Sequence, residues 1–133
     1  MNLRETVRLT GFQDNAIAWY RSADVFVLPS LVEGMPNVLL EAMACGTPVI
    51  SSDCHSGPDE ILQAGRYGQL IPVGSADAIR DAIETTLLQS PAAEEMANAA
   101  QTHITETWSA QSAAKRLEQV LMRCAKRGND SCL

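Results

Sequence analysis

Short apolar runs alternate with amphipathic stretches along the first ninety residues of the chain. The apolar runs stop at glycine, proline or polar residues, and they predict strands at 7–12, 24–30, 47–53 and 67–74. Neither DVFVLPS nor TPVISSD alternates polar with apolar residues, as is typical of strands buried on both faces. The amphipathic stretches predict helices that begin behind Asp14 and Asn15, at Pro36, near Pro58 and at Ser75.

The last third of the chain has a helical pattern throughout. Residues 92–127 predict two helical pieces that meet near Trp108–Ser109. Alternating strands and helices with short connections predict an α/β domain with a largely parallel sheet. Ligands bind such sheets beyond the carboxyl ends of the strands. We therefore expect the functional edge at 30–37 and 53–58.

Composition and charge indicate a globular domain and argue against some classes of partner. The chain has 133 residues, 46% hydrophobic and 20% charged, which is typical of one globular domain. Its net charge of −6 divides into +3 over 115–133 and −9 over the rest. An acidic body argues against nucleic acid as a partner. We interpret the basic tail as a solvated helix face, with peripheral contact to an anionic membrane surface as the alternative.

The cysteine spacing and the length of the apolar runs indicate in which cellular compartment the protein is expected. Four cysteines without C-x-x-C spacing predict reduced thiols rather than disulfides or a zinc site. No apolar run approaches the roughly 20 residues of a membrane-spanning helix, and a secretory signal pattern is absent from the N-terminus. We expect a cytoplasmic location, with the inner face of the membrane as the alternative. The cysteines are Cys45, Cys54, Cys124 and Cys132.

The segment EGMPNVLLE at 33–41 carries the candidate chemistry. A glycine-containing loop leads into a helix whose first N–H groups lack internal partners and suit a diphosphate. Gly34 allows the backbone to approach a ligand closely. Glu41, about one turn into the helix, can accept hydrogen bonds from a ribose diol, and Glu33 can reach hydroxyls beyond the diphosphate. On spacing alone a simple turn followed by a helix explains the segment as well.

A family resemblance extends over these residues. PSLVEGMPNVLLEAMACGTPVISSD closely resembles the donor-site signature of the family 4 retaining glycosyltransferases, in which seven residues separate two glutamates. Glu33 and Glu41 have that spacing. The flanking LTGFQDNAIAWYRSADVFVLPS and SGPDEILQAGRYGQLIPVG are also similar to the family, in the expected order. The resemblance covers about residues 5–90, and the helical remainder resembles the family's C-terminal helices more loosely.

The resemblance implies a role for each matched residue. Glu33, the catalytic-site residue, would hydrogen-bond hydroxyls of the transferred sugar, and Glu41 would bind the ribose diol. Phe12 would lie near the nucleobase, at the end of the first strand. The donor sugar and diphosphate would be surrounded by the backbone of Gly34, Met35, Pro36, Asn37 and Val38. We expect no metal or other cofactor, because no Asp-x-Asp pair is present to hold a metal on the diphosphate.

The resemblance also implies an incomplete domain. Residues 1–91 would form part of a Rossmann-like nucleotide-sugar-binding domain, and 92–133 would form C-terminal helices that pack on it. The family's N-terminal domain, the first two strands of the C-terminal domain and a basic pair that neutralises the diphosphate would be missing. We therefore expect the chain alone to transfer sugar poorly or not at all. With its first two strands missing, 7–12 would slide against 24–30, or the chain would self-associate or be partly ordered.

The implied function is transfer of a sugar from a nucleoside-diphosphate sugar to a glycan or lipid-linked acceptor. SGPDEIL resembles branches that use UDP-sugars for bacterial surface polysaccharides. An epimerase or a phosphorylase of the same fold is an alternative, although the absence of lysine before Lys115 disfavours a pyridoxal phosphorylase. A truncated, non-catalytic module that at most binds nucleotide sugar is the other alternative. An in-frame coding extension upstream of Met1 would favour the enzyme.

Overall fold

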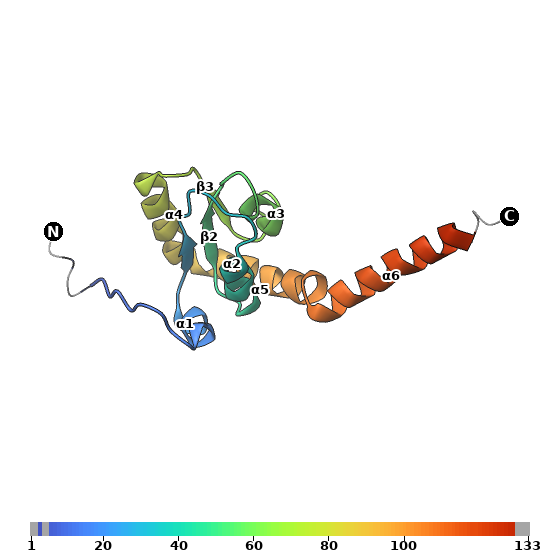
Figure 1. Cartoon of the computed structure of the whole chain (residues 1–133). Helices are drawn as coiled ribbons and strands as arrows, with labels where there is room; N and C mark the ends of the chain where they lie inside the picture. The colour runs from blue at the N-terminus through green and yellow to red at the C-terminus, as the bar shows by residue number, and fades with distance from the viewer. Residues whose placement is uncertain (1–2, 4–5, 130–133) are drawn as a thin grey trace.

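The computed structural model describes residues 3 and 6–129, with side chains as far as residue 125. These residues form six helices and three strands, which alternate along the chain as far as α4 and are followed by α5 and α6 (Figure 1). The strands are β1 (Phe26–Leu28), β2 (Val49–Ser52) and β3 (Gln69–Ile71). The helices are α1 (Ala16–Ser22), α2 (Asn37–Ala44), α3 (Pro58–Leu62), α4 (Ala76–Leu88), α5 (Ser90–Thr107) and α6 (Ala110–Asn129).

The three strands form one parallel sheet in the order β1-β2-β3. Phe26 pairs with Val49, and Ile50 pairs with Gln69. This order confirms the parallel α/β prediction and places consecutive strands side by side, with helical crossovers between them. All four residues of β2 are buried, as the absence of polar–apolar alternation in TPVISSD predicts.

Helices cover both faces of the sheet. On one face, Leu39 and Met43 of α2 pack with Val49 and with residues of α3 and α5. On the other face, Ile50 and Ile71 pack against Ala82 of α4. Val49 and Ile50 point to opposite faces because successive side chains of a strand alternate. The sheet is therefore the middle layer of three.

Two of the predicted helix starts are confirmed by their caps. The Asn15 side chain accepts a hydrogen bond from the Ala18 N–H, and the Ser75 hydroxyl accepts one from the Ala78 N–H, both at 3.2 Å. Each bond satisfies an amide that has no partner inside its helix. Helix α2 begins one residue later than predicted, since Pro36 is its N-cap rather than its first residue.

The predicted strand at 7–12 is wrong. These residues form no strand, and they run as an extended arm away from the sheet (Figure 1). Leu9 is 97% exposed, and the predicted pairing of the segment with β1 does not occur. In the strand order that the family resemblance implies, this segment pairs with a strand that is absent from the described residues. Without a neighbouring strand its backbone has no ladder partner.

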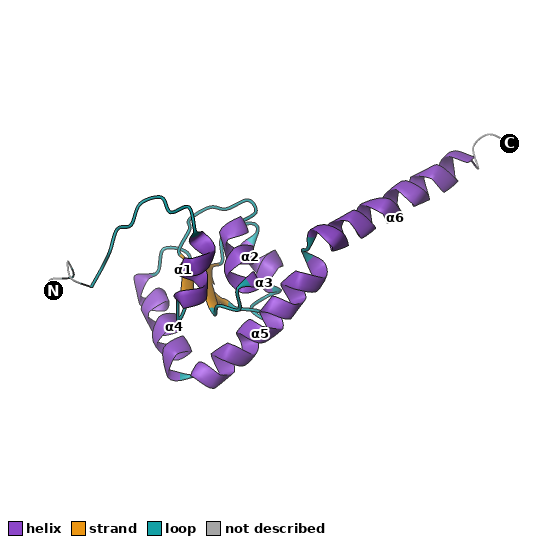
Figure 2. Cartoon of the chain, turned by 90° about the horizontal axis from the view of Figure 1, so that it is seen from below, coloured by secondary structure: helices purple, strands orange, loops and turns teal. Residues whose placement is uncertain are grey.

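The C-terminal helices differ in their packing. Helices α5 and α6 meet at Trp108–Ser109, as the sequence predicts. Helix α5 packs on α2 and α4, and the Gln101 side chain donates to the Ala44 carbonyl at 2.9 Å. Helix α6 instead projects away from the sheet (Figure 2), with residues 113–125 exposed, so the prediction that both helices pack on the body is wrong for α6.

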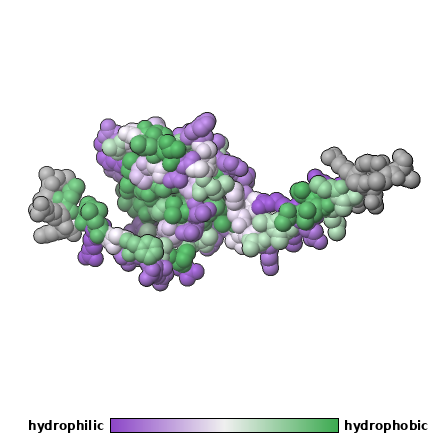
Figure 3. Space-filling view, in the orientation of Figure 1, coloured by the Kyte–Doolittle hydropathy of each residue, from purple (hydrophilic) through white to green (hydrophobic). Residues whose placement is uncertain are grey.

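The surface of α6 carries apolar side chains beside basic ones (Figure 3). The structure describes the side chains of three basic residues of the tail, Lys115, Arg116 and Arg123. The side chains of Lys126 and Arg127 lie outside the described part of the chain. No helix within the described residues is long and apolar enough to cross a membrane. Cys45, Cys54 and Cys124 are free thiols, and Cys132 lies outside the described residues.

Candidate functional site

Two loops meet at the carboxyl edge of the sheet. One follows β1 and contains Glu33, and the other follows β2 and contains Ser56. The Ser56 hydroxyl donates to the Glu33 carbonyl at 2.9 Å. The predicted functional segments, 30–37 and 53–58, are thus in direct contact, which agrees with the expected position of ligand sites in parallel sheets.

Gly57 sets how closely the two loops approach. Its φ of +91° lies in the region that side chains disfavour. A Cβ atom at this position would lie 2.6 Å from the Gly34 carbonyl oxygen and 2.7 Å from the Pro36 ring. Only glycine fits here without displacing the Glu33 loop.

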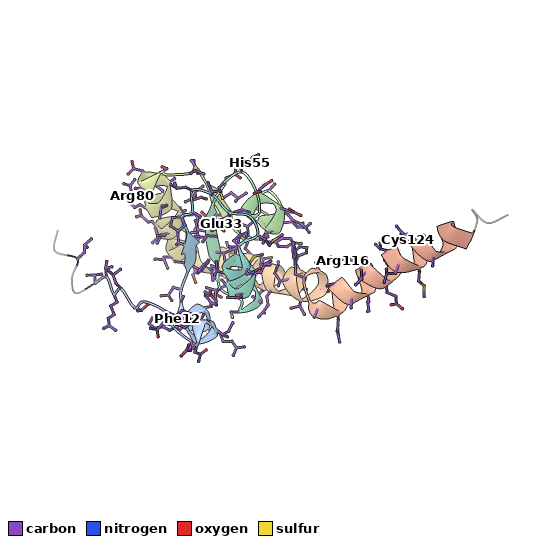
Figure 4. All side chains as sticks on the ribbon, viewed as in Figure 1. Phe12, Glu33, His55, Arg80, Arg116 and Cys124 are labelled. Carbon is purple, nitrogen blue, oxygen red and sulfur yellow. The ribbon has the colours of Figure 1, made fainter. Side chains whose placement is uncertain are left out.

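The Glu33 side chain is half-buried and held from within its own loop. The Ser30 hydroxyl donates to Glu33 Oε1 at 2.6 Å. Such a short bond to a carboxylate is a strong, charge-assisted one. A carboxylate has about four acceptor positions, so one hydroxyl leaves Glu33 able to accept hydrogen bonds from a ligand. Figure 4 shows Glu33 at this edge of the sheet.

Helix α2 begins directly behind this loop. Its N-cap residue, Pro36, is buried and supplies no side-chain cap of the kind that α1 and α4 have. Asn37 and Val38 in its first turn are exposed, as are Gly34 and Met35 before it. The positive end of the helix dipole and the first-turn amides therefore face an accessible space, where an anion is favoured.

Glu41 lies one turn further along α2 and is exposed. The Tyr20 hydroxyl of α1 donates to its Oε2 atom at 3.2 Å. Burial raises the pKa of the Tyr20 phenol, and the charge of Glu41 and the hydrogen bond to it raise that pKa further. The phenol therefore remains a protonated donor at neutral pH.

Phe12 does not lie beside Glu33 in the structure (Figure 4). It is 90% exposed, on the arm beside α1 (Figure 4). Its expected contact with a nucleobase stays a prediction. Within the described residues, no three His, Cys, Asp or Glu side chains form a group that could hold a metal ion.

Sequence reasoning singled out none of four residues that shape this site, although three of them lie in the predicted functional segments, 30–37 and 53–58. The sequence pattern assigns no site role to Tyr20, and it does not predict the contacts of the other three. The partners of Tyr20, Ser56 and Gly57 lie more than 20 residues away in the chain, so no local spacing indicates these contacts. The one sequence signal concerns Gly57: in HSGPD a glycine directly precedes a proline, which indicates a turn or another special backbone conformation. The missed residues are Tyr20, Ser30, Ser56 and Gly57.

Residues 1–103 match the family described as glycosyl transferases, group 1. The match covers more than three quarters of the chain and includes both glutamates and the three-stranded sheet. The chain belongs to this family. Its Glu33 loop and α2 are therefore elements of a glycosyltransferase fold, which confirms the predicted relationship to glycosyltransferases at the level of the group 1 family.

Two relatives of this glycosyltransferase chain are named for the biosynthesis of amylovoran and of the lipopolysaccharide core. The amylovoran biosynthesis glycosyltransferase AmsK of Erwinia amylovora is 42% identical over 86 residues, 59% of this chain and 21% of AmsK. The lipopolysaccharide core biosynthesis glycosyltransferase LpsE of Rhizobium meliloti is 38% identical over 78 residues, 59% of this chain and 23% of LpsE. The chain thus spans about a fifth of the length of these relatives.

Solved structures confirm the Rossmann-like fold. Sucrose-phosphate synthase of Thermosynechococcus elongatus is 29% identical with a TM-score of 0.81, over 95% of this chain and 32% of that enzyme. Anabaena Alr3699/HepE, solved in complex with UDP, superposes with a TM-score of 0.85 at 22% identity, over 91% of this chain and 33% of that protein. The C-terminal domain of LpcC of Francisella tularensis has a TM-score of 0.68 at 25% identity, over 78% of this chain and 53% of that domain.

Proposed function

We propose that this chain is the donor-binding part of a retaining glycosyltransferase, belonging to its C-terminal domain. The observation that carries the proposal is the position of two glutamates on either side of one helix start. Glu33 precedes α2 and Glu41 lies one turn inside it, at the carboxyl edge of a parallel sheet. Membership of the group 1 family and likeness to the LpcC C-terminal domain support it.

Each part of a nucleoside-diphosphate sugar has a counterpart in this arrangement. The diphosphate lies against the first-turn amides of α2, where the helix dipole favours negative charge. The exposed Glu41 carboxylate accepts hydrogen bonds from the ribose diol. Glu33 accepts hydrogen bonds from the hydroxyls of the transferred sugar.

Glu33 acts as an orienting group in this proposal and not as a nucleophile. Its Oε1 atom is already occupied by the Ser30 hydroxyl at 2.6 Å, which lowers its tendency to attack. Sugar transfer passes through an oxocarbenium-like transition state, as in glycoside hydrolysis. A carboxylate that fixes the sugar hydroxyls contributes by holding the anomeric carbon in a reactive position. No metal ion takes part in this scheme.

The finer assignment concerns donor and acceptor. We take the donor to be a UDP-sugar and the acceptor to be a glycan or lipid-linked sugar of a surface polysaccharide. The names of AmsK and LpsE support the acceptor class, and the SGPDEIL segment supports the donor base. The reaction would take place in the cytoplasm, with α6 and its basic tail as the part that reaches the inner face of the membrane.

Catalysis requires positive charge near the diphosphate, and residues 22–57 around the Glu33 loop contain no lysine or arginine. No lysine precedes Lys115, and the nearest arginines before and after the Glu33 loop in sequence are Arg21 and Arg66. Stabilisation of the leaving diphosphate by preorganised charge supplies much of the rate in such reactions. We propose that a partner N-terminal domain and a basic pair supply this charge, so the isolated chain binds donor and turns it over poorly.

The test is a titration of the ¹⁵N-labelled chain with UDP, followed by NMR. Amide shifts should move at Gly34, Asn37 and Val38, and Glu41→Gln should weaken the binding. Glu84→Gln is the matched control, since Glu84 is an exposed glutamate of α4 on the opposite face of the sheet. Equal UDP affinity in the wild-type chain and Glu41→Gln would contradict the proposed function.

A further inference from the structure

The Tyr20 phenol joins α1 to the candidate nucleotide site on α2. Its hydroxyl donates to Glu41 Oε2 at 3.2 Å, and the two residues belong to different helices, 21 positions apart. The contact therefore depends on how α1 packs against α2 and does not follow from helix geometry alone.

The position of Tyr20 is set by neighbours other than Glu41. Its ring packs edge to face on Phe26 of β1, with ring centroids 5.4 Å apart and an interplanar angle of 88°. The buried Thr47 hydroxyl donates to the Tyr20 carbonyl at 2.7 Å. Ring and backbone are thus anchored to the sheet, and the hydroxyl is a donor at a fixed place.

Glu41, in contrast, is an exposed side chain without such anchors of its own. An exposed glutamate samples several rotamers, and immobilising it on ligand binding carries an entropic cost. A fixed donor at Oε2 lowers this cost and leaves Oε1 to accept from a ligand. The rigid partner in this pair is Tyr20, and the oriented partner is Glu41.

We propose that Tyr20 is a positioning residue for Glu41: its hydroxyl holds the carboxylate in the orientation that receives the ribose diol. This inference rests on the proposed function of Glu41. Tyr20 then makes two separate contributions: its ring packs on Phe26, and its hydroxyl orients Glu41. Phenylalanine would suffice for the first and not for the second.

Binding measurements test the role of the hydroxyl. Tyr20→Phe should weaken UDP binding by about two- to tenfold, the factor that corresponds to one side chain immobilised on binding. Tyr67→Phe is the matched control, because Tyr67 is the other tyrosine of the chain and stacks on His103 of α5. Tyr67→Phe should bind UDP as the wild-type chain does. Unchanged affinity in Tyr20→Phe together with weakened affinity in Glu41→Gln would overturn the positioning role alone.

A second readout needs no ligand. The pKa of Tyr20, followed by ¹³Cζ tyrosine NMR, should fall in Glu41→Gln, because the negative charge that opposes ionisation of the phenol is removed. It should not change in Glu33→Gln, and Cys45, the other group that raises this pKa, stays in place in both variants. An unchanged Tyr20 pKa in Glu41→Gln would show that the contact does not form in solution. If neither the wild-type chain nor Glu41→Gln binds UDP, the proposed function fails, and the positioning role of Tyr20 fails with it. The pKa of Tyr20 would still show whether the Tyr20–Glu41 contact forms.

Discussion

Gly57 lies so close to Gly34 that a side chain on Gly57 would reach within 2.6 Å of the Gly34 carbonyl oxygen. The contact joins the loop after β2 to the loop after β1. Ser56, one residue earlier, adds a hydrogen bond to the same loop at the Glu33 carbonyl. The backbone around Glu33 is therefore shaped by a neighbouring strand's loop, not only by its own.

Gly57→Ala should destabilise the fold and displace the Glu33 loop. The positive φ at residue 57 and the close approach to Gly34 and the Pro36 ring both oppose a methyl group. We expect a loss of about 2–4 kcal/mol in the free energy of unfolding, measured by urea denaturation.

Gly74→Ala is the matched control for that change. Gly74 also has a positive φ, +73°, but no atom lies within 4 Å of a Cβ built there. It should lose about 1 kcal/mol, the cost of a left-handed conformation alone. Equal losses in the two variants would show that the loop contact at Gly57 contributes nothing.

Ser30→Ala should affect the sugar and not the nucleotide. The substitution removes the 2.6 Å bond that holds Glu33 Oε1, while Glu41 and the start of α2 are untouched. In calorimetric titrations of the chain we expect UDP affinity to stay constant and the extra affinity of the cognate UDP-sugar to fall by about three- to tenfold. Ser30→Thr retains the hydroxyl and should restore part of that affinity. A parallel loss for UDP would argue against separate roles.

Strand β1 has an open edge that amide exchange can detect. Phe26 N donates to Pro48 O at 2.8 Å, toward β2. Because N–H groups alternate in direction along a strand, the Val27 amide points toward the side without a described neighbour. We expect Val27 to exchange faster than Phe26 and Leu28 in dilute solution. Protection of Val27 that rises with protein concentration would show self-association through this edge, and light scattering would confirm it.

The arrangement of helices and strands was largely predictable because it depends on local patterns. The caps at Asn15 and Ser75 and the position of β2 each follow from nearby residues. The segment at 7–12 was also predicted as a strand from its local pattern, and it forms none. A strand is stable only with a neighbour, and the sequence of one segment does not contain that neighbour.

The two glutamates of the candidate site could be predicted from the sequence, but the side chains that hold them in place could not. The spacing of Glu33 and Glu41 on one loop and one helix indicates the site, since both positions follow from a single short segment. The hydroxyl of Tyr20 reaches Glu41 only because α1 packs beside α2. Contacts of this kind arise from tertiary packing, which no local periodicity contains.

The most direct test compares two ligands with two variants. UDP and the cognate UDP-sugar, chosen from a panel, are titrated by calorimetry into the wild-type chain, Glu41→Gln and Glu33→Gln. Glu41→Gln should weaken both ligands by about fivefold, the effect of one partly exposed charge-assisted hydrogen bond. Glu33→Gln should leave UDP binding unchanged and remove the added affinity of the sugar. Equal losses of both ligands in both variants would contradict the division of the donor between the two glutamates.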